Sequence, residues 1–326
     1  MISKASVQRI LVTGAAGFVG PHLVEAFQTH CPDAEILLTG HSSSVHPRLG
    51  RIESLDVTSR AACVDVIGAW RPTDVINLAG FAAPGLAAKN PDLTWAIHLE
   101  GCRNLAEAIL QKTPECRFTQ IGTGLVYGKP ASRDSVSEDG VLAPLDDYAA
   151  SKGAADLAIG VYARKGLRCL RLRPFNHSGP GQSEDFVIPA FAIQIARIEA
   201  GLADPLVRVG NLDAERDILD VADVADAYAR TVAADWCENG EIFNIASGVP
   251  VRIETLLEHL LALSGLHIQV ERDPARDRPS DVPFIAGEAK KFRKAFNWKP
   301  RFNLNETLRR VLEDCRARVS RSQKLA

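Results

Sequence analysis

The sequence predicts an α/β protein in which a doubly wound parallel sheet is followed by a smaller α/β lobe. Three observations support this fold class. Short apolar runs recur through the first half of the chain and alternate with segments of helical periodicity. A glycine-rich turn follows the first of these runs. After Arg173, shorter elements are separated by loops rich in proline, glycine and charge.

The elements of the first part follow a regular order. Strands are expected at residues 9–12, 35–38, 51–55, 74–78, 117–121 and 168–173. Helices are expected at residues 17–30, 59–70, 91–111 and 148–165. Because strand–helix–strand crossovers are right-handed, such units give parallel strands with helices on both faces of the sheet.

The second part is shorter and less regular. Helices are expected near residues 186–199, 253–264 and 305–319. Residues 216–246 again have the pattern of a strand, a helix and a strand, so we expect them to return to the first domain. The predicted division is a domain at 1–175 joined by 216–246, and a lobe at 176–215 and 247–326.

Composition narrows the class of partner. The chain has 326 residues, of which 46% are hydrophobic, and its 38 basic and 40 acidic residues leave a formal net charge of −2. This balance argues against nucleic acid or an anionic membrane as a partner. No apolar run approaches the ~18 residues of a membrane span, and the 7 cysteines lack metal-type spacing. We therefore expect a cytoplasmic protein with reduced thiols, no bound metal and small-molecule partners.

The first strand leads into three glycines spaced three residues apart. Gly14 permits a sharp turn, Gly17 lets the backbone approach a pyrophosphate, and Gly20 lets the next helix lie close to the sheet. The phosphates would lie at the positive end of that helix. This arrangement predicts a dinucleotide site.

A second group of residues has the chemistry of proton transfer. Tyr148 and Lys152 are four residues apart, so on a helix they share one face, and we expect the lysine cation to lower the pKa of the tyrosine. Thr123 follows the strand near residue 117, at the edge where ligands bind to parallel sheets. It either donates a hydrogen bond to a substrate oxygen or satisfies a turn carbonyl. The alternative for Tyr148 and Lys152 is a half-buried tyrosine beside a solvated lysine. Tyr127 is interpreted as structural.

Taken together, these motifs resemble the extended short-chain dehydrogenase/reductase family of nucleotide-sugar epimerases, dehydratases and reductases, which has a Rossmann-like fold. The resemblance covers nearly the whole chain and implies that Thr123, Tyr148 and Lys152 are catalytic. It implies a homodimer formed through helices 91–111 and 148–165, whose outer faces would otherwise be solvated. The residues that it places against the cofactor are Gly14, Gly17, Phe18, Val19, Gly20, Asp56, Val57, Leu78, Ala79, Gly80, Tyr148, Lys152 and Pro174.

The cofactor is expected to be NADP(H) or NAD(H). No acidic residue follows the second strand to bind a ribose hydroxyl, since the chain continues as His41 and then three serines. His41 or Arg48 could attract the 2′-phosphate of NADP(H), or both could be solvated loop residues. The sequence thus favours NADPH modestly and leaves NADH open.

Two positions depart from the pattern of related enzymes. Many dehydratases of the family carry glutamate where this chain has Leu125, and a leucine cannot transfer protons. Many relatives have asparagine where this chain has His98, which leaves the proton relay through that helix open. Ketone reduction is the simpler chemistry that remains, with Tyr148 protonating the oxygen, Thr123 binding it and Lys152 holding the nicotinamide ribose.

Segments beginning at Arg173, Val209 and Asp273 resemble those of GDP-4-dehydro-6-deoxy-D-mannose reductases. The expected reaction is NAD(P)H-dependent reduction of the C4 ketone of a nucleotide-linked 4-keto-6-deoxyhexose, above all GDP-4-dehydro-6-deoxy-D-mannose to GDP-D-rhamnose. The alternatives are a C4 epimerase that retains NAD and a non-catalytic dinucleotide sensor.

The resemblance also places side chains against the substrate diphosphate. These are Asn176, Arg216 and Arg278. Arginine suits the role because its planar fork pairs with phosphate oxygens. The alternative for the two arginines is an ion pair with a neighbouring aspartate, Asp217 or Asp277.

Overall fold

The computed structural model describes residues 7–82, 84–130, 132–235, 239–277 and 282–325. Within these residues, the largest sheet has eight strands in the order β11-β7-β6-β5-β1-β2-β4-β3. Its strands are β1 (Arg9–Thr13), β2 (Glu35–Gly40), β3 (Ser44–His46), β4 (Gly50–Ser54), β5 (Asp74–Asn77), β6 (Arg117–Ile121), β7 (Arg168–Pro174) and β11 (Glu241–Ile245). Around it lie α1 (Gly20–His30), α2 (Arg60–Trp70), α3 (Pro84–Lys89), α4 (Pro91–Trp95), α5 (Gly101–Lys112), α6 (Asp147–Arg164), α8 (Val221–Ala233) and α10 (Lys290–Phe296).

The order of the strands locates the ligand-binding crevice. Successive strands run outward from β1 in one direction through β2 and β4, and in the other through β5, β6, β7 and β11. These neighbours pair in parallel, and β3 adds an antiparallel edge. Between β1 and β5 the connections change direction, and ligands bind outside the carboxyl ends of strands at such a point. The predicted doubly wound Rossmann-like sheet is confirmed.

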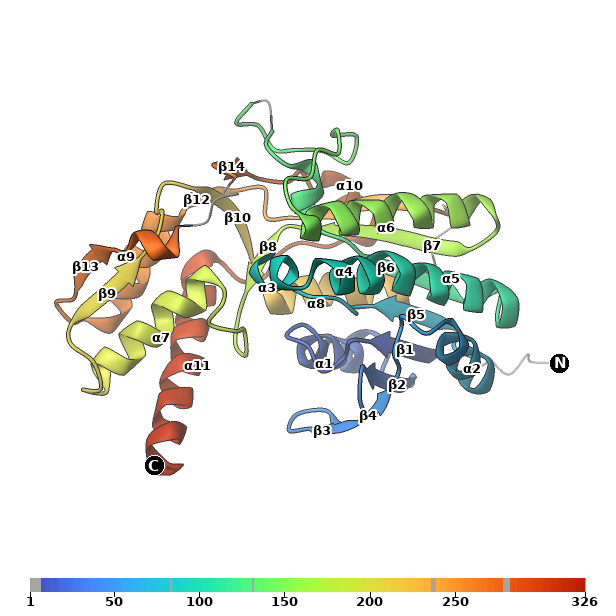
Figure 1. Cartoon of the computed structure of the whole chain (residues 1–326), viewed down its shortest axis with the longest axis horizontal. Coiled ribbons are helices and arrows are strands. Elements are labelled where there is room, and N and C mark those ends of the chain that lie inside the picture. Colours follow the sequence, from blue (N-terminus) through green and yellow to red (C-terminus); the bar gives the residue numbers. More distant parts are fainter. Residues whose placement is uncertain (1–6, 83, 131, 236–238, 278–281, 326) are drawn as a thin grey trace.

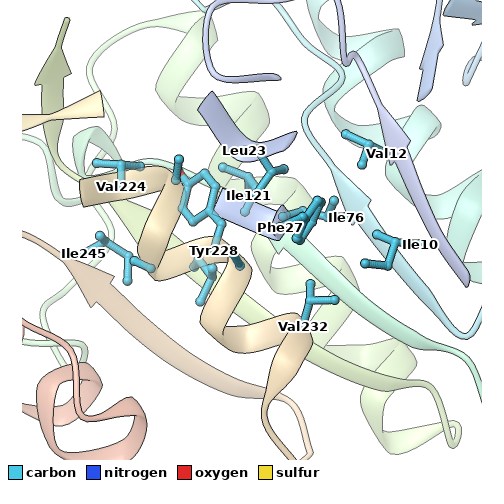
Figure 2. Packing of buried hydrophobic residues seen from close by; sticks show 14 of the residues in the cluster. Ile10, Val12, Leu23, Phe27, Ile76, Ile121, Val224, Tyr228, Val232 and Ile245 are labelled. Carbon is cyan, nitrogen blue, oxygen red and sulfur yellow. The ribbon is translucent and has the colours of Figure 1, made fainter. Parts of the chain in front are cut away.

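Alternate residues of the strands build a core on each face of this sheet. Ile10 and Val12 of β1 pack with Leu23 and Phe27 of α1 and with Tyr228 of α8, as Figure 2 shows. Leu11, between them in sequence, points to the other face, where α2, α5 and α6 contribute the buried cluster. Burying both faces requires strands that are apolar at successive positions, which explains the continuous apolar runs in the sequence.

A smaller lobe lies beyond one end of the sheet (Figure 1). Its strands are β8 (Asn176–Ser178), β9 (Leu206–Val209), β10 (Glu215–Asp220), β12 (Pro250–Arg252), β13 (Gln269–Arg272) and β14 (Phe284–Ile285). Its helices are α7 (Val187–Glu199), α9 (Ile253–Ser264) and α11 (Leu304–Leu325), which share a separate buried cluster. β10 pairs with β8, β12 and β14, while β9 pairs with β13.

Some elements differ from the sequence prediction. The helix expected at 17–30 begins at Gly20, because the residues before it form the glycine turn. The helix expected at 91–111 is divided into α4 and α5 by a π-helical turn, Ala96–Glu100. The edge strand β3 and the short α3 were not expected. Of residues 216–246, α8 contacts α1 and β11 joins the large sheet, whereas β10 lies in the smaller sheet. The division into domains stays a prediction.

Candidate active site

A cavity of about 740 Å³ opens at the carboxyl edge of the large sheet, where the strand order reverses. Its walls include the glycine turn, the residues that follow β2, β5 and β6, the start of α6 and part of the smaller lobe. A second cavity of about 430 Å³ continues into the smaller lobe, and Asn176, His177 and Arg216 line both. The shared lining residues show that the two cavities adjoin.

The glycine turn forms one wall of the large cavity. Gly14 has a φ of +63°, and a Cβ on it would lie 2.8 Å from the backbone of Leu78 and Ala79. A Cβ on Gly20 would lie 1.8 Å from the carbonyl oxygen of Ala15, so α1 could not start so close to the turn. No side chain caps α1 at Val19. Its N-terminus is therefore available to a phosphate, as the motif predicts.

Most residues predicted to hold the cofactor line this cavity. They are Gly14, Gly17, Phe18, Val19, Asp56, Val57, Leu78, Ala79, Gly80, Tyr148, Lys152 and Pro174. Gly20 lies behind the turn, where it allows the close approach of α1. The Asp56 carboxylate accepts hydrogen bonds from the backbone and hydroxyl of Thr58 at 2.9 and 2.7 Å, and the hydroxyl bond lowers the pKa of Asp56.

The two candidates for a 2′-phosphate ligand are placed differently. His41 lines the large cavity just after β2. Arg48 is an exposed residue whose guanidinium lies 3.3 Å from the Glu25 carboxylate. An exposed ion pair of this kind is weak and easily exchanged for another partner.

Thr123, Tyr148 and Lys152 meet in the same cavity. Thr123 caps the short 3₁₀ helix Gly124–Tyr127, where its Oγ1 accepts a hydrogen bond from the Leu125 N–H at 3.2 Å. The hydroxyl hydrogen of Thr123 is thus not used by this cap. Tyr148 and Lys152 lie on the first turns of α6 and are 9% and 6% exposed.

Burial dominates the electrostatics of this pair. It raises the pKa of Tyr148 to about 12, against a lowering effect of the Thr123 hydroxyl, and lowers the pKa of Lys152 to about 8. The Lys152 ammonium donates to the Ile121 carbonyl at 3.1 Å. The expectation that the Lys152 cation lowers the pKa of Tyr148 is wrong for this structure, because desolvation of the phenolate raises that pKa and the lowering effect comes from the Thr123 hydroxyl. Tyr148 is consequently protonated at neutral pH.

Asn176 and Arg216 are brought together at the junction of the two cavities, by β8 and β10. The neighbouring Asp217 is fully buried and accepts hydrogen bonds from Ser247, Gly248 and Gly287. Asp277 forms an ion pair with Arg272 at 3.0 Å. Arg278 lies outside the described residues.

A network of buried polar residues joins α6 to β7 and so supports the site. This network was not predicted from the sequence. Asp156 of α6 pairs with Arg171 at 2.9 Å and with Arg173 at 2.7 Å, both on β7. Tyr127 donates to Asn244 and accepts from Arg173, each at 2.8 Å, which agrees with its structural interpretation. The feature of the sequence that could have predicted this network is the pair of arginines two residues apart on one strand. The network ties α6, and hence Tyr148, to the sheet.

Comparisons with known proteins agree with this geometry. Residues 11–311 match the sequence profile of the family described as GDP-mannose 4,6 dehydratase. The chain belongs to this family. A curated relative, GDP-6-deoxy-D-mannose reductase of Pseudomonas aeruginosa, is 34% identical over 319 residues, which cover 96% of this chain and 98% of the relative.

Solved structures of similar proteins share the fold. RMD from Pseudomonas aeruginosa, complexed with NADPH, matches with a TM-score of 0.83 and 32% identity, covering 96% of this chain and 100% of that one. UDP-glucose 4-epimerase of Thermus thermophilus, complexed with NAD, matches with a TM-score of 0.80 and 26% identity, covering 95% and 99%. The chain is thus an extended short-chain dehydrogenase/reductase, and its family consists of nucleotide-sugar enzymes that use nicotinamide dinucleotides.

Two further expectations concern cysteines and membranes. The described cysteines are free and buried, and Cys237 lies outside the described residues. Among the described helices, none combines the length and apolar character needed to cross a bilayer.

Proposed function

We propose that this protein reduces the C4 ketone of a nucleotide-linked 4-keto-6-deoxyhexose with NADPH or NADH, and that its substrate is GDP-4-dehydro-6-deoxy-D-mannose, giving GDP-D-rhamnose. The observation that carries the proposal is the meeting of the Tyr148 and Thr123 hydroxyls in a cavity that also holds Leu125. A hydroxyl pair can polarise and protonate a ketone. A leucine cannot serve the proton transfers of dehydration.

The roles of the residues follow from their environments. Tyr148, protonated at neutral pH, is the acid that gives its proton to the ketone oxygen, and the Thr123 hydroxyl donates a hydrogen bond to the same oxygen. The Lys152 ammonium holds the nicotinamide ribose and supplies a cation beside the phenolate that forms. The bound dihydronicotinamide supplies the hydride.

The fit of a dinucleotide is supported by the glycine turn, by the uncapped start of α1 and by the Asp56 carboxylate in the cavity wall, which we assign to the adenosine end. His41 at the end of β2 favours NADPH, and the relative's complex with NADPH is consistent with this. We assign Asn176 and Arg216, which line both cavities, to the diphosphate of the sugar nucleotide, and the second cavity to its nucleoside. We assign Arg278 to the same diphosphate from the resemblance alone.

The protein is proposed to work as a homodimer in the cytoplasm. On α6, Leu157 and Val161 are 60% and 46% exposed. These residues offer apolar area for a partner subunit on one of the two helical segments that the family resemblance points to. The buried free thiols suit a reducing compartment. Analytical ultracentrifugation tests the dimer.

The test of function uses purified protein, each reduced nicotinamide and GDP-4-dehydro-6-deoxy-D-mannose. Substrate-dependent loss of dihydronicotinamide absorbance, with GDP-D-rhamnose as the product, is expected. Interconversion of C4 epimers without net cofactor consumption would instead identify the epimerase. A protein that binds dinucleotide but turns over none of a panel of GDP-, UDP- and dTDP-linked 4-keto sugars would be the sensor.

A further inference from the structure

The backbone of Leu125 is fixed beside the Thr123 hydroxyl. Its N–H donates to Thr123 Oγ1 at 3.2 Å, and its carbonyl accepts a hydrogen bond from the Gly128 N–H at 3.1 Å. Both bonds belong to the 3₁₀ helix Gly124–Tyr127 and its end. The Leu125 side chain therefore starts one hydrogen bond away from the hydroxyl that we assign to the ketone oxygen.

Leu125 and Phe81 form an apolar wall against the catalytic tyrosine. Phe81 lies beyond the carboxyl end of β5, so it reaches the site from a different strand. Both side chains pack against the buried cluster of Ala87, Tyr148 and Ala149, and both are partly exposed. Because both also line the large cavity, their exposed parts belong to its surface. We call these two residues the apolar wall.

The apolar wall is continuous with a second buried cluster. Leu125 packs against this cluster, which contains Phe175, Val282 and Ile285. These three residues line the same cavity. Apolar side chains thus extend from Leu125 to the smaller lobe, which contributes Ile285 on β14.

One carboxylate of the cavity lining also lies near Tyr148 in the chain. Asp146 precedes α6, and its Oδ1 accepts the Ala149 N–H at 2.8 Å. This bond caps the helix, as aspartate commonly does. Asp146 is therefore tied to the start of α6 and is not part of the apolar wall.

The proposed substrate has a methyl group close to its reacting carbon. In a 4-keto-6-deoxyhexose, C4 is bonded to C3, which carries a hydroxyl, and to C5, which carries the C6 methyl. When the ketone oxygen lies between the hydroxyls of Thr123 and Tyr148, C6 is two bonds from the carbon that receives the hydride. An apolar surface beside those hydroxyls suits a methyl group, whereas a hydroxyl placed there would lose its hydrogen bonds to water.

We infer that Leu125 and Phe81 form the subsite for C6 of the sugar and select a 6-deoxyhexose over the corresponding hexose. The inference rests on the proposed function for the place of the ketone oxygen. It gives Leu125 a positive role, since the side chain supplies a surface for the methyl group. An apolar pocket rejects an added hydroxyl by about 10²-fold, so we expect a preference of this size.

Two sugar nucleotides test the apolar wall because they differ by one oxygen atom. GDP-D-rhamnose, the proposed product, is GDP-mannose without the oxygen on C6. The affinity for each is measured by calorimetry on protein saturated with NADPH, or with NADH if that binds more tightly. Sugar and dinucleotide are then both reduced, so no reaction interferes. We expect the wild type to bind GDP-D-rhamnose about 10²-fold more tightly than GDP-mannose.

Three variants show whether this preference comes from the apolar wall. Leu125→Asn introduces an amide of similar size that can bond a C6 hydroxyl, and it should reduce the preference to about tenfold or less. Leu125→Met keeps the side chain apolar and should keep the preference of the wild type. Leu202→Asn is the matched control, because Leu202 is 55% exposed and is not among the described residues that line either cavity. It should leave the preference unchanged.

Equal affinity of the wild type for the two compounds, or an unchanged preference in Leu125→Asn, overturns the inference. If Leu125→Asn does not fold, Phe81→Gln tests the same wall from its second residue, with the same loss expected. If another nucleotide binds in place of GDP, the matched compounds are glucose and 6-deoxyglucose linked to that nucleotide.

The inference and the proposed function can fail separately. Ketone reduction by a wild type without the preference would refute the apolar wall alone. The preference in a protein that reduces none of the 4-keto sugars would refute the proposed function alone. A protein that binds no sugar nucleotide would refute both.

Discussion

The buried pair of Asp156 with two arginines makes a quantitative prediction. Asp156 is 2% exposed, and its side-chain partners Arg171 and Arg173 are 15% and 3% exposed. Asp156→Asn removes the charge without changing the volume, which leaves two guanidinium groups facing one neutral amide. Breaking a buried ion pair from one side costs about 3–5 kcal/mol. We place this loss at about 3 kcal/mol, the low end of that range, because Arg171 keeps the Gly240 carbonyl and Arg173 keeps the Tyr127 hydroxyl.

Urea unfolding followed by circular dichroism measures the effect. The matched control is Glu53→Gln, which neutralises one partner of the exposed pair with Arg51, whose side chains are 39% and 80% exposed. The control should lose at most about 1 kcal/mol of unfolding free energy. If Asp156→Asn lost no more than the control, the network would not be what holds α6 on the sheet, and the reasoning from burial would be refuted.

Four further outcomes are expected. Tyr148→Phe should lower kcat by about 10²–10⁴-fold while dinucleotide affinity is retained, since only the proton donor is lost; an active variant would exclude Tyr148 as the acid. For the free enzyme, kcat/KM should fall as the pH rises through about 8, because Lys152 loses its charge there; a profile flat to pH 10 would contradict this. Arg216→Ala should raise KM for the sugar nucleotide by about 10-fold or more, from the loss of a charge-assisted hydrogen bond, and leave the dinucleotide affinity unchanged in a binding titration. Gly20→Ala, whose Cβ would lie 1.8 Å from the Ala15 carbonyl oxygen, should lower both the Tm and the dinucleotide affinity, and normal values of both would show that α1 can shift freely.

Local sequence patterns predicted the fold correctly where a residue type has a single structural role. Gly14 has the positive φ that the turn requires, and the apolar runs lie in the parallel sheet. Tyr148 and Lys152 lie on one helix, as their spacing indicated. Such features depend on residues close together in the chain, so they can be inferred without knowing the contacts of distant segments.

The prediction of the pKa of Tyr148 was less accurate than the prediction of the fold. The pKa of Tyr148 depends on how completely the phenol is desolvated, and that depends on every segment around the cavity. The spacing of Tyr148 and Lys152 contains no information about burial. The outcome was a raised pKa where a lowered one was expected.

By itself the sequence determined the class of fold, the glycine turn and the residue types available for proton transfer, because short-range geometry and hydrophobic periodicity are local properties of the chain. Only the tertiary structure decided that Thr123 meets Tyr148, that Asp156 binds both arginines of β7 and that His98 of the π-helical turn bonds Ser151 of α6. These contacts join residues on separate elements, and their strength depends on burial, which exists only once the chain has folded.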